Sequence, residues 1–223
     1  MTLINYKHIP IEESSESLVL LSDKEFILSP EYHKMGLTDT GDMYLREGLI
    51  DKLLKVQKSL TPFKLKIWDG FRPLEVQGKL YDNIYNSIRE GHPEMTEEEV
   101  FKNAGKYITP VKDIEQIPPH LTGGSVDLTL VDLEGKEVDM GTEFDHFGEE
   151  SSYSYSGLSD EVRKNRKILR DAMTSQGFRP DCAEWWHFDY GNQLWAVYYG
   201  EKFAVYGEGK SRKLEDKKNR IQE

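Results

Sequence analysis

Helices and strands follow one another in this chain without a regular alternation, and this order restricts the fold more than any other feature. Apolar side chains recur at helical spacing over residues 42–60, whereas residues 63–67 alternate apolar side chains with lysines, as a half-buried strand does. Further helices are predicted from Pro73, from a capping box at Thr96 and from Ser159. The sequence therefore predicts an α+β fold with a mainly antiparallel central sheet flanked by helices.

Three further segments are predicted to be strands, namely residues 125–132, 185–190 and 194–199. The chain has 223 residues, a length that suits one domain with a sizeable core. We expect this domain to span residues 1–209. Residues 210–223 are almost wholly polar and are interpreted as a tail that forms a solvated helix or a disordered end.

The charge of the chain argues against two classes of partner. Lys and Arg number 29 against 40 Asp and Glu, which gives a net charge of −11 and argues against nucleic-acid or anionic-membrane partners.

No apolar run approaches the roughly 20 residues of a membrane span, and the N-terminus lacks a secretory-signal layout. We therefore expect a cytoplasmic protein. Cys182 is the only cysteine, which excludes an intrachain disulfide and a Cys-rich zinc site, and nothing in the composition specifies an oligomeric state.

Two histidines lie in unusual surroundings. His120 belongs to the Pro- and Gly-rich residues 107–124 and precedes Asp127 by seven positions, and His187 ends the segment Glu184-Trp-Trp-His187. A hydrolytic zinc needs three protein ligands and a position for water, and two imidazoles with one carboxylate would supply them. Each residue alone also has an ordinary explanation, because a loop histidine is usually not a ligand and an Asp at a strand start usually belongs to a turn.

Two further charged residues allow a structural and a functional interpretation. Glu184 and His187 would point to opposite faces of a regular strand, so a shared site requires irregular backbone between them. Arg72 follows a predicted strand, where it would either pair with an acidic surface or point into a cleft and stabilise an oxyanion.

Four motifs occur in one order along the chain: Trp68-Asp-Gly-Phe-Arg-Pro73, His120-Leu-Thr-Gly-Gly-Ser-Val-Asp-Leu-Thr-Leu130, Met140-Gly-Thr-Glu-Phe-Asp145 and Glu184-Trp-Trp-His187. This series resembles the D-alanyl-D-alanine dipeptidases, zinc peptidases that belong with the D-Ala-D-Ala carboxypeptidases and related cell-wall peptidases. The resemblance extends over roughly residues 45–195. It implies a DD-peptidase-like fold, shared with hedgehog domains, and the hydrolysis of D-Ala-D-Ala or a similar short dipeptide by metal-activated water.

The resemblance also implies roles for individual residues. The ligands that it implies for one zinc ion per chain are His120, Asp127 and His187. Glu184 would be the catalytic base, Arg72 would stabilise the transition state, and Asp145 would lie near the free amino group of the substrate. His146, beside Asp145, is the principal rival as a metal ligand.

The sequence departs from the family motif S-x-H-x-x-G-x-A-x-D at two positions, where Pro118 replaces the Ser and Ser125 the Ala. The loop before the first ligand thereby loses a hydroxyl and a backbone donor. We expect this change to shift the accepted substrate side chains and to leave the metal chemistry intact. The family places a tyrosine beside the substrate, for which Phe26 and Tyr32 are both candidates.

The sequence leaves two alternatives to a dipeptidase function. A D,D-carboxypeptidase or endopeptidase would act on peptidoglycan stem peptides outside the cytoplasm and would normally need an export signal. A non-catalytic zinc-containing binding domain, as in hedgehog proteins, would need neither Glu184 nor Arg72. The presence of both residues favours an enzyme.

Overall fold

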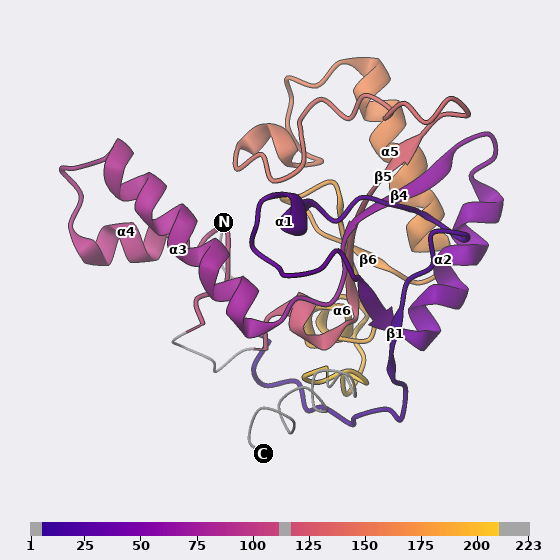
Figure 1. Cartoon of the computed structure of the whole chain (residues 1–223), viewed down its shortest axis with the longest axis horizontal. Helices are drawn as coiled ribbons and strands as arrows, with labels where there is room; N and C mark the ends of the chain where they lie inside the picture. Colours follow the sequence, from indigo (N-terminus) through magenta and orange to yellow (C-terminus); the bar gives the residue numbers. More distant parts are fainter. Residues whose placement is uncertain (1–5, 112–116, 210–223) are drawn as a thin grey trace.

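A five-stranded sheet forms the centre of the molecule, and a computed structural model describes residues 6–111 and 117–209 (Figure 1). The sheet consists, in spatial order, of β2 (Ile27–Leu28), β4 (Lys64–Asp69), β5 (Ser125–Val131), β7 (His187–Asp189) and β6 (Arg179–Pro180). Only the β2–β4 pair is parallel, so the predicted α+β fold with a mainly antiparallel sheet is confirmed. The predicted tail, residues 210–223, lies outside the described residues.

One face of β5 is apolar and the other is polar. Val126, Leu128 and Leu130 belong to the main hydrophobic core, together with apolar residues of the helices α2 (Glu47–Ser59) and α5 (Asp160–Ser175). Because side chains alternate along a strand, Ser125, Asp127 and Thr129 lie on the opposite face. The whole strand is buried, so this second, polar face is covered as well.

A bulge in β4 adds a further carboxylate to the polar face. The register runs from Ile67 opposite Leu128 to Asp69 opposite Asp127, so Trp68 is the extra residue. A bulge of this kind re-aims the following side chain to the other face of the sheet. Asp69, Asp127 and His187 are consequently cross-strand neighbours on three adjacent strands.

Helix α2 begins later than its apolar periodicity predicts. Residues Tyr44–Arg46 form β3, which pairs with β1 (Leu18–Leu20) in a separate two-stranded sheet. Leu45 is fully buried in the main core although it belongs to a strand, which is why it fits the helical spacing. In Figure 1, α2 and α5 lie together on one side of β4 and β5.

Helices α3 (Leu74–Gly91) and α4 (Glu97–Ala104) pack against each other and project from the rest of the molecule (Figure 1). The capping box predicted at Thr96 is confirmed, since its hydroxyl accepts from the Glu99 N–H and the Glu99 carboxylate accepts from the Thr96 N–H. A second core cluster joins this pair to α1 (Glu31–Lys34); its buried members are Tyr32, Val76, Leu80, Tyr81, Ala104 and Ile108.

One predicted strand is wrong, because residues 194–199 belong to the helix α6 (Gln193–Tyr199). The Asn192 side chain accepts from the Trp195 N–H, and Gly200 ends the helix with φ 70°. Trp195 and Tyr199 contact each other across one helical turn, with ring centroids 5.7 Å apart. The aromatic residues that suggested a strand therefore fit helical spacing equally well.

Two short 3₁₀ helices complete the described elements, η1 (Pro119–Thr122) and η2 (Glu149–Ser151). The first lies within the Pro- and Gly-rich loop and contains His120. Among the described helices, none has both the length and the hydropathy that crossing a membrane requires.

Candidate active site

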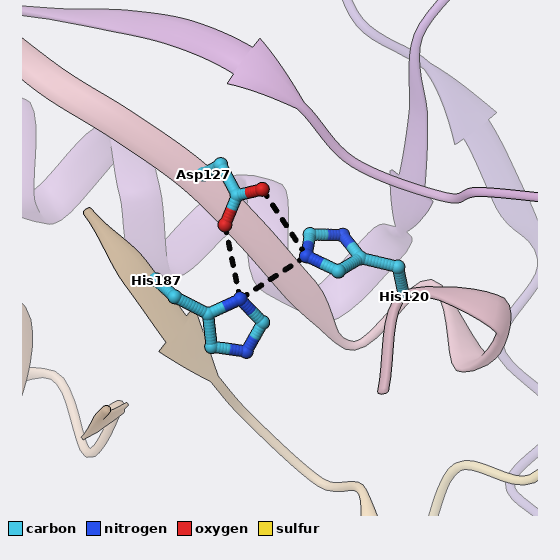
Figure 2. A group of neighbouring side chains, drawn as sticks. All are labelled: His120, Asp127 and His187. Carbon is cyan, nitrogen blue, oxygen red and sulfur yellow. Dashed lines mark hydrogen bonds and ion pairs between the residues drawn. The ribbon is translucent and has the colours of Figure 1, made fainter. Parts of the chain in front are cut away.

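Three buried side chains from three elements converge on one point (Figure 2). Asp127 on β5 and His187 on β7 are opposite each other in the antiparallel ladder, and η1 brings His120 to the same place. Asp127 Oδ1 lies 3.0 Å from His187 Nδ1, Asp127 Oδ2 lies 3.2 Å from His120 Nε2, and the two ring nitrogens are 3.1 Å apart. The structure thus brings together the three residues predicted as metal ligands.

The donor atoms fit a zinc ion. Tetrahedral bonds of about 2.0–2.1 Å place neighbouring ligand atoms about 3.3 Å apart, close to the separations in this cluster. The outer nitrogen of each ring already has an acceptor, because His120 Nδ1 lies 2.7 Å from the Gly70 carbonyl and His187 Nε2 lies 3.0 Å from Asp189 Oδ1. Each neutral imidazole can therefore donate outward and present a lone pair to the centre. Two nitrogens and a carboxylate oxygen without thiolate are typical of a catalytic zinc site.

The charges within the cluster shift one another's pKa values. Burial opposes the charged form of His187, but Asp189 and Asp127 outweigh it and raise the pKa of His187 well above its usual value. Burial likewise opposes ionisation of Asp127, yet His120 and His187 lower the pKa of this carboxyl. Because a ligand imidazole must be neutral, metal binding to the cluster displaces a proton, and metal affinity should increase with pH.

A cavity of about 290 Å³ opens onto the cluster and is lined by the other predicted functional residues, Arg72, Asp145 and Glu184. The backbone of residues 184–187 is irregular, because the His187 N–H donates to the Glu184 carbonyl over 3.3 Å in a tight turn. This turn satisfies the condition for a shared site, since both side chains line the same cavity.

Glu184 has the perturbed protonation expected of a general base or acid. Burial raises the pKa of Glu184 to about 8; the positive charge of His187 opposes this rise, and the carboxylates of Asp181 and Asp127 add to it. A carboxyl group with a pKa near the working pH can both take up and release a proton during a reaction.

Arg72 does not pair with an acidic surface but is buried beside the cluster. Its Nε donates to Asp69 Oδ2 over 2.9 Å, its Nη1 to Gln77 Oε1 over 3.2 Å, and its Nη2 to the Tyr32 hydroxyl over 3.0 Å. Nη2 is also 3.5 Å from Asp127 Oδ2. Although burial opposes the charge, Tyr32 and the carboxylates raise the pKa of Arg72, so a fixed, fully charged guanidinium faces the site.

Asp145 also lines the cavity, lies on a loop and has φ 57°, a value that few residues other than glycine adopt. The Tyr32 hydroxyl donates to Asp145 Oδ2 over 3.0 Å, and burial raises the pKa of Asp145 to about 6. Of the two aromatic candidates, Tyr32 lines the cavity, whereas Phe26 belongs to the main core. The rival ligand His146 is exposed, lies 3.4 Å from Glu150, and is not part of the cluster.

Comparison with known proteins decides the family. A family profile described as D-ala-D-ala dipeptidase matches residues 45–206, which is most of the chain. The chain belongs to the D-Ala-D-Ala dipeptidase family. Membership confirms the relationship predicted from the four motifs.

Relatives within the family extend over different shares of the chain. The D-alanyl-D-alanine dipeptidase of Synechocystis is 30% identical over 91% of this chain and 95% of its own length. The D-alanyl-D-alanine dipeptidase of Enterococcus faecalis is 30% identical over 60% of this chain and 65% of its own length. Among solved structures, the vancomycin resistance D,D-pentapeptidase VanY has a TM-score of 0.45 at 13% identity, over 75% of this chain and 84% of that chain.

In this member of the D-Ala-D-Ala dipeptidase family, the site contains a residue that the sequence analysis missed, namely Asp189. Asp189 is fully buried and accepts from His187 Nε2, so it orients a candidate ligand. Its signal was an acidic residue two positions after a histidine on a strand, which places both on one face. The two residues that depart from the family motif lie in different surroundings. Pro118 lines the cavity, whereas the Ser125 hydroxyl donates to Asp189 Oδ1 over 2.7 Å.

Proposed function

We propose that this chain is a zinc-dependent dipeptidase that hydrolyses D-Ala-D-Ala or a similar short dipeptide. The observation that carries the proposal is the convergence of His120, Asp127 and His187 in a cavity whose wall also holds a buried carboxyl group and a fixed guanidinium. Membership of the D-Ala-D-Ala dipeptidase family supports the reaction, and the names of the Synechocystis and Enterococcus relatives support the substrate.

Glu184 is the proposed general base. A zinc ion held by the three ligands would lower the pKa of a bound water to about 7 and polarise the peptide carbonyl. Glu184, which is not one of the ligands, takes the proton from the attacking water and passes it to the leaving amine. The raised pKa of Glu184 suits this double task, because a carboxyl group with a pKa near the working pH can both take up and release a proton.

Arg72 is the proposed electrostatic stabiliser. Attack on the carbonyl carbon moves negative charge onto the oxygen, and the guanidinium beside Asp127 can donate to that oxygen as the charge develops. Its contacts with Asp69, Gln77 and Tyr32 fix it before substrate arrives. No reorganisation is then needed during the reaction, which makes such a donor effective.

Asp145 and the size of the cavity account for a preference for dipeptides. The ionised carboxylate of Asp145, which lines the cavity, is the proposed partner of the substrate ammonium group. The cavity volume of about 290 Å³ is close to the lower limit for ligand pockets, which is about 300 Å³. A short zwitterionic substrate satisfies both constraints.

The direct test is hydrolysis by the purified chain with one equivalent of zinc. The panel contains D,D-, L,D- and L,L-dipeptides and an N-acylated tripeptide ending in D-Ala-D-Ala. We expect cleavage of the free D,D-dipeptide and none of the acylated tripeptide, because acylation removes the positive charge that Asp145 would bind. The control is Glu184→Gln, which should keep zinc and lose activity. Preferential cleavage of the acylated tripeptide would instead identify a carboxypeptidase.

A further inference from the structure

Asp189 connects a candidate metal ligand to the polar interior of the sheet. It lies two residues after His187 on β7, is fully buried, and accepts a hydrogen bond from His187 Nε2 over 3.0 Å. The partner of one imidazole nitrogen determines which nitrogen remains for a metal. The position of this carboxylate therefore determines whether His187 Nδ1 points toward Asp127 and His120.

Asp189 is in turn held by three donors, from β5, from β6 and from the residue before α6. Ser125 Oγ and Asn192 Nδ2 each donate to Asp189 Oδ1 over 2.7 Å, and Arg179 Nη1 donates to Asp189 Oδ2. Asn192 Nδ2 also lies 3.1 Å from Ser125 Oγ, so the hydroxyl is fixed as well as donating. Ser125 is directly opposite Asp189 in the β5–β7 register and is fully buried.

We propose that Ser125 is a positioning residue of the metal centre, which orients Asp189 together with Asn192 and thereby holds His187 Nδ1 in place for the metal. The proposal rests on the proposed metal site. Ser125 does not line the cavity, so it acts on the ligand and not on the substrate. Its hydroxyl contacts only Asp189 and Asn192 within hydrogen-bonding distance among the described residues.

The same strand offers a matched control. Thr129 lies four residues after Ser125 on β5, on the same face, and is equally buried. Its Oγ1 has no hydrogen-bond partner among the described residues. Thr129→Val therefore removes a buried hydroxyl from this strand without touching Asp189, whereas Ser125→Ala removes the hydroxyl that holds it.

The experiment measures zinc affinity on the full chain by competition with a chelator, and the visible spectrum of the Co²⁺-substituted protein. Loss of an outer hydrogen-bond partner of a metal ligand typically costs about 10- to 100-fold in affinity. Because Asn192 shares the task, we expect Ser125→Ala to bind zinc about 10-fold more weakly and to change the Co²⁺ spectrum. Ser125→Cys, of similar size with a weak donor, should lie between Ser125→Ala and the unmodified chain.

Thr129→Val should bind zinc as the unmodified chain does. Unchanged affinity and spectrum in Ser125→Ala would overturn the proposal. An equal loss of affinity in Ser125→Ala and Thr129→Val would overturn it as well. If Ser125→Ala fails to fold, Ser125→Cys decides in its place: unchanged affinity and spectrum overturn the proposal. A chain that binds no zinc even without substitution would overturn the proposed function, and this inference with it.

Discussion

Arg72 is the residue whose surroundings best specify its task, since a buried guanidinium is fixed by three neighbours beside the candidate ligands. Arg72→Ala removes the donor to the developing oxyanion, and we expect kcat to fall by about 100- to 1,000-fold. Zinc content should be unchanged, because Arg72 is not a ligand. Steady-state kinetics and metal analysis of the same sample check both points. A kcat within about threefold of the unmodified chain would contradict the role.

Asp145 should combine a benefit for binding with a cost in stability. Burial raises its pKa from 3.8 to about 6, so only above about pH 6 is the carboxylate ionised to accept a substrate ammonium. We expect KM to fall as the pH rises through about 6, and Asp145→Asn to lose this dependence. Kinetics between about pH 5 and 8 provide the measurement.

The stability effect of Asp145 has a defined sign. Its folded-state pKa is raised, so between pH 3.8 and about 6 the folded chain binds more protons than the unfolded chain. The free energy of unfolding therefore decreases as the pH rises through this window. Asp145→Asn should be more stable than the unmodified chain at about pH 7, and the difference should vanish below about pH 4. Urea denaturation of the metal-free proteins measures it; equal stability at both pH values would show that burial does not perturb Asp145.

The elements differ in how far local sequence specifies them. The capping box at Thr96 and the alternating apolar residues of β5 are local signals, and both were predicted correctly. Residues 194–199 were predicted as a strand, because their aromatic side chains suit either structure and the Asn192 cap decides for a helix. The late start of α2 follows from pairing of β3 with β1, a contact between segments 26 residues apart that no local pattern contains.

Helix α5 positions the loop that bears Asp145. The buried Arg166 donates from Nε to the Met140 carbonyl over 2.8 Å, and from its two terminal nitrogens to the carbonyls of Ser152 and Glu150 over 2.9 and 2.8 Å. Arg166→Lys keeps a charge but cannot form this fork. We expect a loss of about 3 kcal/mol in the free energy of unfolding and a higher KM, with zinc content unchanged.

Arg163 provides the matched control for this prediction. It is exposed on the same helix and donates to the carbonyls of Tyr155 and Ser156 in the same loop region. Arg163→Lys should change stability by less than about 1 kcal/mol, as surface contacts usually do. Denaturant unfolding and steady-state kinetics compare the two variants. An unaltered KM in Arg166→Lys would mean that the loop keeps its shape without the fork.

For the molecule as a whole, the metal centre should act as a cross-link between segments distant in sequence. We expect zinc to bind only the folded chain, because His120, Asp127 and His187 come together only there. Free zinc at about 100 times its Kd should raise the free energy of unfolding by about 2.7 kcal/mol. Thermal melts with zinc and with a chelator measure this shift.

Single substitutions assign the shift to the ligands. His120→Ala and His187→Ala should lose the zinc-dependent stabilisation. His146→Ala should keep it, because the exposed His146 lies outside the cluster. The opposite result, loss in His146→Ala and retention in His187→Ala, would make His146 the ligand.

The sequence by itself determined the α+β class, the family and the chemical types of the candidate donors, because these depend on local periodicity and on short motifs. Only the tertiary structure decided that Asp127 Oδ1 and His187 Nδ1, from residues 60 positions apart, lie 3.0 Å from each other. It also decided that Tyr32 and not Phe26 lines the cavity, and that Ser125 faces Asp189. Cross-strand register and burial arise from contacts between distant segments, and burial is the main cause of the raised pKa values of Glu184 and Asp145.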